Sequence, residues 1–94
     1  MTIPKSMRFV DISKPGGPEV LQLASGPVPQ AGPDQLLIRV SAAGVNRPDI
    51  LQRRGAYPVP AGASPIPGLE VCGEVVACGE GTAKFRKGEQ ICAL

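Results

Sequence analysis

Glycine and proline interrupt this chain so often that a long helix has little room to form. They supply 12 and 11 of its 94 residues, more than average usage, and both residue types favour turns over helix interiors. The longest such stretch is residues 55–68, which contain four prolines and three glycines. The composition therefore predicts a mainly β domain, with short strands joined by tight corners and one or two short helices.

Five segments have the pattern of β-strands. The first two flank Lys14-Pro15-Gly16-Gly17-Pro18, a composition typical of a hairpin turn. In residues 35–43 apolar side chains alternate along the segment, which predicts one buried face. Gly73 lies inside another segment and predicts a bulge or a sharp bend there. The expected strands are residues 7–13, 19–24, 35–43, 68–78 and 89–94.

One helix is expected at residues 47–54. Asn46 is a good N-cap, because its side-chain oxygen can accept a hydrogen bond from a backbone N–H of the first turn. Pro48 fits an early helical position, where its missing N–H costs little. Asp49 is a first-turn carboxylate that the helix dipole favours. Gly55 follows the last helical residue, as expected of a helix end.

Three motifs carry a family resemblance. They are G-V-N-R-P-D-I-L-Q-R-R-G-A-Y-P at 44–58, P-G-L-E-V-C-G-E-V-V-A-C-G-E-G at 67–81 and K-G-E-Q-I-C-A-L at 87–94. Together with the opening M-R-F-V-D-I-S they resemble the N-terminal, GroES-like catalytic domain of the zinc-free medium-chain dehydrogenases/reductases, of the NADPH:quinone oxidoreductase type. The resemblance implies a GroES-like, partly open β-barrel over residues 1–94.

The same resemblance implies that this domain is incomplete and that a nucleotide-binding Rossmann domain is absent. In the family, the nucleotide lies on a doubly wound domain with a glycine fingerprint. The glycines of this chain form no G-x-G-x-x-G. We therefore expect the chain alone to be inactive, with NADPH bound mainly by the missing domain.

The resemblance also implies the site residues. Asn46 would lie near the nicotinamide or its ribose, and Tyr57 would border the cleft as a cofactor contact and a catalytic proton donor. Asp49 would contact the cofactor or the substrate, and Glu70 would be a polar group at the edge of the site. Simpler structural roles remain open for all four: helix capping for Asn46 and Asp49, loop packing for Tyr57 and backbone hydrogen bonding for Glu70.

No metal site is expected. In zinc-dependent members of the superfamily, a cysteine occupies the position of Asn46 and a histidine that of Leu69, and this chain contains no histidine. Metal-free hydride transfer is therefore implied. Three cysteines are an odd number, so a disulfide framework is not expected. Cys72, Cys78 and Cys92 are interpreted as small buried hydrophobic residues in preference to zinc ligands.

The net charge of +2 is too small to indicate nucleic acid or membrane binding. We expect a cytoplasmic protein whose partner is a small quinone or enone substrate, with self-association through exposed strand edges. Two alternatives remain: a co-chaperonin-like module and a non-catalytic binding module with the same barrel. The proline-rich loop around Tyr57 is a poor match for the mobile apolar loop that a co-chaperonin would need.

Overall fold

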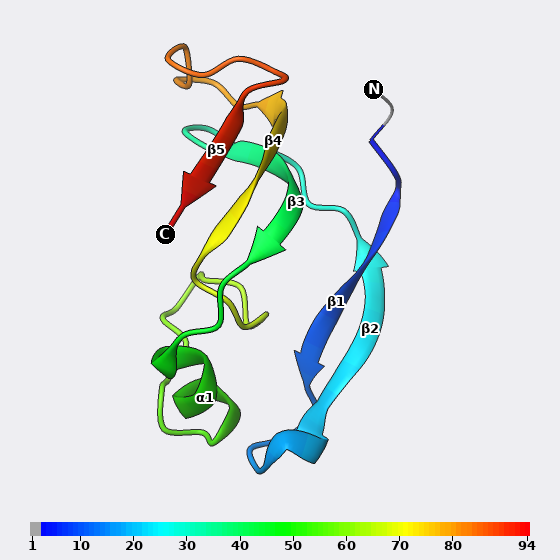
Figure 1. Ribbon diagram of the computed structural model, residues 1–94, viewed down its shortest axis with the longest axis vertical. Helices are drawn as coiled ribbons and strands as arrows, with labels where there is room; N and C mark the ends of the chain where they lie inside the picture. The colour runs from blue at the N-terminus through cyan, green and yellow to red at the C-terminus, as the bar shows by residue number, and fades with distance from the viewer. Residues whose placement is uncertain (1–2) are drawn as a thin grey trace.

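The computed structural model describes residues 3–94 and arranges them as two separate antiparallel sheets (Figure 1). A two-stranded hairpin lies beside a three-stranded sheet in the order β3-β4-β5, and α1 lies at one end. None of the helices among the described residues is long and apolar enough to span a membrane. The elements are β1 (Ser6–Ile12), the 3-10 turn η1 (Pro18–Val20), β2 (Leu21–Pro27), β3 (Leu36–Ala43), α1 (Arg47–Arg53), β4 (Val71–Cys78) and β5 (Gln90–Ala93).

All five predicted strands form, but the second begins later than expected. Glu19 and Val20 belong to η1 instead, because Pro18 fixes a backbone angle suited to a helical turn. The turn is closed by the backbone N–H of Val20, which donates to the carbonyl of Gly17 at 3.1 Å. Val20 thereby becomes one of the buried apolar side chains, only 3% exposed.

The fourth predicted strand also begins later, at Val71 instead of Gly68. Gly68 has φ +119°, outside the extended region that a strand requires. Residues 68–70 therefore finish the long loop, and Glu70 lies just before β4.

Gly73 allows β3 and β4 to approach closely. A side chain there would run into the backbone carbonyl of Arg39 and come within 2.8 Å of Ile38 Cγ2. The pairing register shifts beside it, between Val40 and Ala42 of β3. The irregularity expected from Gly73 is thus present, with the extra residue on the facing strand.

The hydrophobic core is small, and both sheets are left open. Among the described residues only Val20 and Val75 are buried hydrophobic residues, and Val75 has no exposed surface. Large apolar side chains such as Leu23, 71% exposed, and Val40, 53% exposed, face outward. The sheets do not close into a complete barrel, which confirms the expected mainly β, partly open architecture.

The hairpin turn is tied to the end of α1. The backbone N–H of Gly16 donates to the carbonyl of Arg53 at 2.9 Å, and Arg53 Nε donates back to the carbonyl of Gly16 at 3.1 Å. Figure 1 shows the turn and α1 at the same end of the molecule. Arg53 therefore links the hairpin turn to the end of α1.

The cysteine predictions were wrong in two respects. Cys72 and Cys92 form a disulfide, because β4 and β5 place them directly opposite each other, with their Cα atoms 4.2 Å apart. Cys78 remains a free thiol, but it is exposed instead of buried. An odd number of cysteines excludes only the case in which every cysteine forms a disulfide. Whether two cysteines lie opposite each other depends on the strand register, which the sequence does not reveal.

We expect reduction of the Cys72–Cys92 disulfide to lower the free energy of unfolding by about 3 kcal/mol, because the bridge closes a 20-residue separation in the unfolded chain. Urea denaturation of a Cys78→Ala variant, with and without a phosphine reductant, measures this loss. The matched control is the same variant with Cys72 and Cys92 both changed to alanine, whose stability should not respond to reductant. Equal midpoints for the bridged protein under both conditions would contradict the prediction.

Candidate functional site

The candidate site begins where β3 ends and α1 starts. Asn46 has an extended backbone, with φ −127° and ψ 164°, and stands at the N-cap of α1 as predicted. Its backbone N–H donates to Asp49 Oδ2 at 2.9 Å, and the backbone N–H of Asp49 donates to the carbonyl of Asn46 at 3.0 Å. Asn46 and Asp49 are therefore held together by two hydrogen bonds within one helical turn.

The Asn46 side chain makes its main contact outside the helix. Its Nδ2 donates to Glu70 Oε1 at 3.0 Å, across 24 positions of sequence. Its oxygen lies toward the Asp49 N–H in a capping-box arrangement but makes no full cap hydrogen bond. The side chain therefore connects α1 to the segment before β4, a role beyond the expected helix capping.

Asp49 uses only one of its two carboxylate oxygens. Oδ2 accepts the Asn46 backbone N–H, while Oδ1 is shielded from solvent and has no hydrogen-bond partner among residues 3–94. The observed contacts are those of a helix-start carboxylate.

Tyr57 lies on a separate segment beyond the end of α1. The helix ends as predicted at Gly55, which has φ +81°, and the backbone N–H of Ala56 donates to the carbonyl of Leu51 at 2.8 Å. Tyr57 is 40% exposed, and within residues 3–94 no hydrogen bond joins it to Asn46 or Asp49. The structure thus joins Asn46, Asp49 and Glu70 by hydrogen bonds, and among residues 3–94 Tyr57 takes no part in these bonds.

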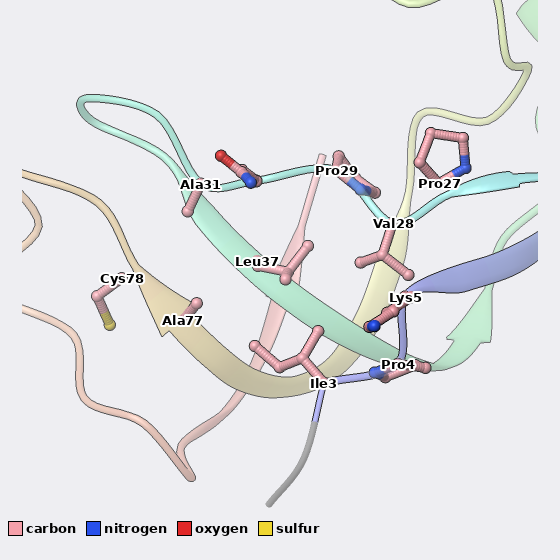
Figure 2. A pocket seen from close by; sticks show the side chains of 11 residues that line it. Ile3, Pro4, Lys5, Pro27, Val28, Pro29, Ala31, Leu37, Ala77 and Cys78 are labelled. Carbon is pink, nitrogen blue, oxygen red and sulfur yellow. The ribbon is translucent and has the colours of Figure 1, made fainter.

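Two hollows lie elsewhere in the described part of the chain, between its N-terminal segment and the larger sheet. They have volumes of about 460 and 470 Å³ and share Ile3, Val28 and Leu37 in their walls. Figure 2 shows the first, with these side chains coming from three different segments. Neither hollow is lined by Asn46, Asp49 or Tyr57. Sequence reasoning missed them because their apolar residues belong to no motif and meet only through tertiary packing.

The described part of the chain offers little for a metal ion. It contains no group of three or more histidine, cysteine, aspartate or glutamate side chains placed to hold one. The Asn46 and Glu70 side chains are instead suited to hydrogen bonding, since an amide offers both donors and acceptors and a carboxylate offers acceptors.

Comparisons with known proteins agree on one family. Residues 32–94 match the family described as Alcohol dehydrogenase GroES-like domain. The chain is 41% identical to the quinone oxidoreductase of Lama guanicoe over 88 residues, which are 90% of this chain and 26% of that protein. It is 39% identical to the quinone oxidoreductase of Homo sapiens over 88 residues, 93% of this chain and 27% of that protein. The chain spans about a quarter of the length of these curated relatives.

Solved structures show the same fold in proteins of different chemistry. A mycobacterial quinone oxidoreductase has a TM-score of 0.79 at 38% identity, covering 92% of this chain and 27% of that one. A mycobacterial protein complexed with NADPH has a TM-score of 0.80 at 37% identity, covering 92% and 25%. A cobalt- and zinc-bound alcohol dehydrogenase from Pyrobaculum aerophilum has a TM-score of 0.78 at 39% identity, covering 93% and 26%.

We expect Asp49→Ala to lower the free energy of unfolding by about 1 kcal/mol, because the Asn46 N–H loses its side-chain acceptor at the start of α1. Asp49→Asn should cost less, since it keeps an acceptor oxygen. Urea denaturation of both variants measures the difference. Asp11→Ala, which removes an exposed carboxylate from β1, is the control. Equal losses for Asp49→Ala and Asp11→Ala would contradict the capping role.

Proposed function

Because this chain belongs to the alcohol dehydrogenase GroES-like domain family, we propose that it forms the substrate-cleft part of an NADPH-dependent quinone or enone oxidoreductase. The observation that carries the proposal is Asn46 at the start of α1, whose side-chain amide donates to Glu70 and whose backbone N–H donates to Asp49. It is supported by about 40% identity to quinone oxidoreductases along almost the whole chain.

The proposed hydride transfer needs no metal. The resemblance places Asn46 and Leu69 where zinc-dependent members have a cysteine and a histidine, and neither an amide nor an isobutyl group replaces those ligands. The zinc-bound structural neighbour shares the fold, so the fold does not decide the metal chemistry. The side chains at the two ligand positions support the metal-free proposal.

The residues present fit the nicotinamide end of the cofactor. Bound NADPH would supply the hydride. Asn46 is exposed and offers amide donor and acceptor atoms to a carboxamide or a ribose hydroxyl. Asp49 would act through Asn46, by fixing its backbone.

Tyr57 is the chain's own candidate for a contact with the acceptor. Its ring, 40% exposed, could pack against a planar quinone. Its hydroxyl would donate a hydrogen bond to the carbonyl oxygen on which negative charge develops, and would be the proton donor there. Tyr57 would then act on the acceptor while Asn46 holds the cofactor.

The 94 residues carry no nucleotide fingerprint, so we propose that they do not reduce a quinone by themselves. A non-catalytic binding module and a co-chaperonin-like module are the other candidate functions for such a barrel. The similarity to quinone oxidoreductases favours the reductase over both.

The proposed location is the cytoplasm. Its glutathione pool keeps most protein thiols reduced. There Cys72 and Cys92 would be a pair of opposed thiols, whereas the structure shows their oxidised form.

We expect no NADPH oxidation by the 94-residue chain above background with 1,4-benzoquinone. A chimera that joins residues 1–94 to the rest of the human quinone oxidoreductase should be active. In that chimera Tyr57→Phe should lower kcat roughly 100-fold, because one donor to the developing oxyanion is lost. Absorbance at the NADPH band measures all three rates.

Val59→Ala, an apolar truncation in the same loop, is the control and should leave kcat unchanged. A chimera that folds, as judged by circular dichroism, and binds NADPH without reducing any quinone or enone would contradict the reductase function. It would favour the binding module.

We also propose that the isolated chain self-associates, because β5 leaves one strand edge unpaired and apolar side chains are exposed on both sheets. Sedimentation velocity should show mass increasing with concentration over the micromolar range. Gln90→Pro removes a backbone donor from β5 and should reduce association, while Gln22→Ala on β2 should not. A sharp monomer at every concentration would count against the proposal.

A further inference from the structure

We propose that Glu70 is a positioning residue that fixes the orientation of the Asn46 side-chain amide. It would thereby determine which atoms Asn46 presents to a hydroxyl or carboxamide group of a bound nucleotide. The ligand side of this inference rests on the proposed function. The orientation itself rests on the contacts of Asn46 with Glu70 and Asp49, and on the packing of Glu70 against Gly44.

The argument begins with the chemistry of the two partners. Asn46 Nδ2 lies 3.0 Å from Glu70 Oε1. An ionised carboxylate has only acceptors, so it favours the amide orientation in which nitrogen faces it and disfavours the flipped one. A solvent-exposed amide without such a partner would have two nearly equivalent orientations.

The opposite side of the amide agrees with the same orientation, beside an Asp49 backbone N–H that donates to the backbone carbonyl of Asn46. With nitrogen toward Glu70, the oxygen of Asn46 lies toward the backbone N–H of Asp49, a donor. A flip would place two acceptors together at Glu70 and two donors together at Asp49. One Nδ2 proton and a lone pair of the side-chain oxygen of Asn46 then remain free for a ligand. A ribose hydroxyl or a carboxamide could use both, because each can donate and accept hydrogen bonds.

Glu70 is itself held in place by Gly44. The backbone N–H of Gly44 donates to the carbonyl of Glu70 at 3.0 Å. A Cβ on Gly44 would collide with Glu70 Oε1 and would lie 2.7 Å from Glu70 Cδ. Gly44 is not among the glycines with positive φ, so its backbone does not require glycine. The absence of a side chain at this position leaves the space that the carboxylate occupies.

The hydrogen bond between Asn46 and Glu70 is exposed to solvent, and exposed contacts of this kind contribute little to stability. Its main consequence is therefore the orientation of the amide. This separates a positioning role for Glu70 from a purely structural one, because loss of the contact should change Asn46 without unfolding the chain.

Asn46 is the only asparagine of the chain, so asparagine-selective ¹⁵N labelling gives a single side-chain amide signal. In the native chain we expect two well separated Nδ2 proton shifts and a nuclear Overhauser contact to the Glu70 γ protons. Glu70→Ala and Gly44→Ala should both bring the shifts to those of a free amide and remove the contact. Glu80→Gln, an exposed carboxylate change, should leave them unchanged.

The second readout is kinetic and uses the chimera. Glu70→Ala and Gly44→Ala should raise the KM for NADPH roughly 10- to 100-fold, because the amide is misplaced. The KM for the quinone should not change. Glu70→Gln should recover part of the loss, since its side-chain oxygen can still accept from Asn46. Gly44→Ala displaces the Glu70 side chain but keeps its charge. Its effect on the KM for NADPH therefore reports the orientation of the Asn46 amide and not the loss of a negative charge.

The two readouts distinguish failure of this inference from failure of the proposed function. An inactive but folded chimera would overturn the reductase function, and the Asn46 signal of the chain and of the chimera would still decide the role of Glu70. The positioning role would be overturned by an active chimera in which Glu70→Ala and Gly44→Ala both leave the KM for NADPH unchanged. An Asn46 signal that is already that of a free amide in the native protein would also overturn it.

Discussion

The structure depends most on the pairing of β4 with both of its neighbours. β4 is the middle strand of the larger sheet, so β3 and β5 have no sheet without it. Val75, at its centre, is fully buried, and its backbone N–H donates to the carbonyl of Glu89 at 2.9 Å. Gly73 permits the close approach of β3, and Cys72 carries the covalent link to β5. The eight-residue strand β4 therefore carries the buried core residue, the glycine that permits close pairing and one cysteine of the disulfide.

Because apolar burial is small, other contacts hold the segments together. The described residues contain two buried hydrophobic side chains, few for a chain of 94 residues. The hairpin is tied to α1 by the reciprocal hydrogen bonds of Gly16 and Arg53, and the long loop is tied to α1 by Gln52 Nε2, which donates to the carbonyl of Pro65 at 2.8 Å. These polar links position the segments that carry the candidate site.

The candidate site combines one local and one distant relationship. Asn46 and Asp49 are three residues apart, a spacing at which helix-start side chains meet. Glu70 reaches Asn46 only because β3 and β4 are paired, which brings residues 44 and 70 beside each other at the end of the ladder. A cobalt- and zinc-bound alcohol dehydrogenase has a similar fold, so the fold alone does not decide the chemistry of this site.

The sequence by itself determined the features that depend on neighbouring residues. The alternation in residues 35–43 predicted β3, Asn46 and Pro48 predicted the start of α1, and Gly55 predicted its end, because strand periodicity, helix capping and positive φ are local effects. The motifs at 44–58, 67–81 and 87–94 also indicated the family, because each is a continuous run of residues that can be compared without knowing how the runs pack.

Only the tertiary structure decided which distant residues meet. The opposition of Cys72 and Cys92, the contact of Glu70 with Asn46 and the hollows beside Leu37 each depend on strand register or on packing between segments far apart in sequence. A shift of one residue in register would send Cys72 or Leu37 to the other face of its sheet. No local pattern encodes that register, so these features follow from the fold as a whole.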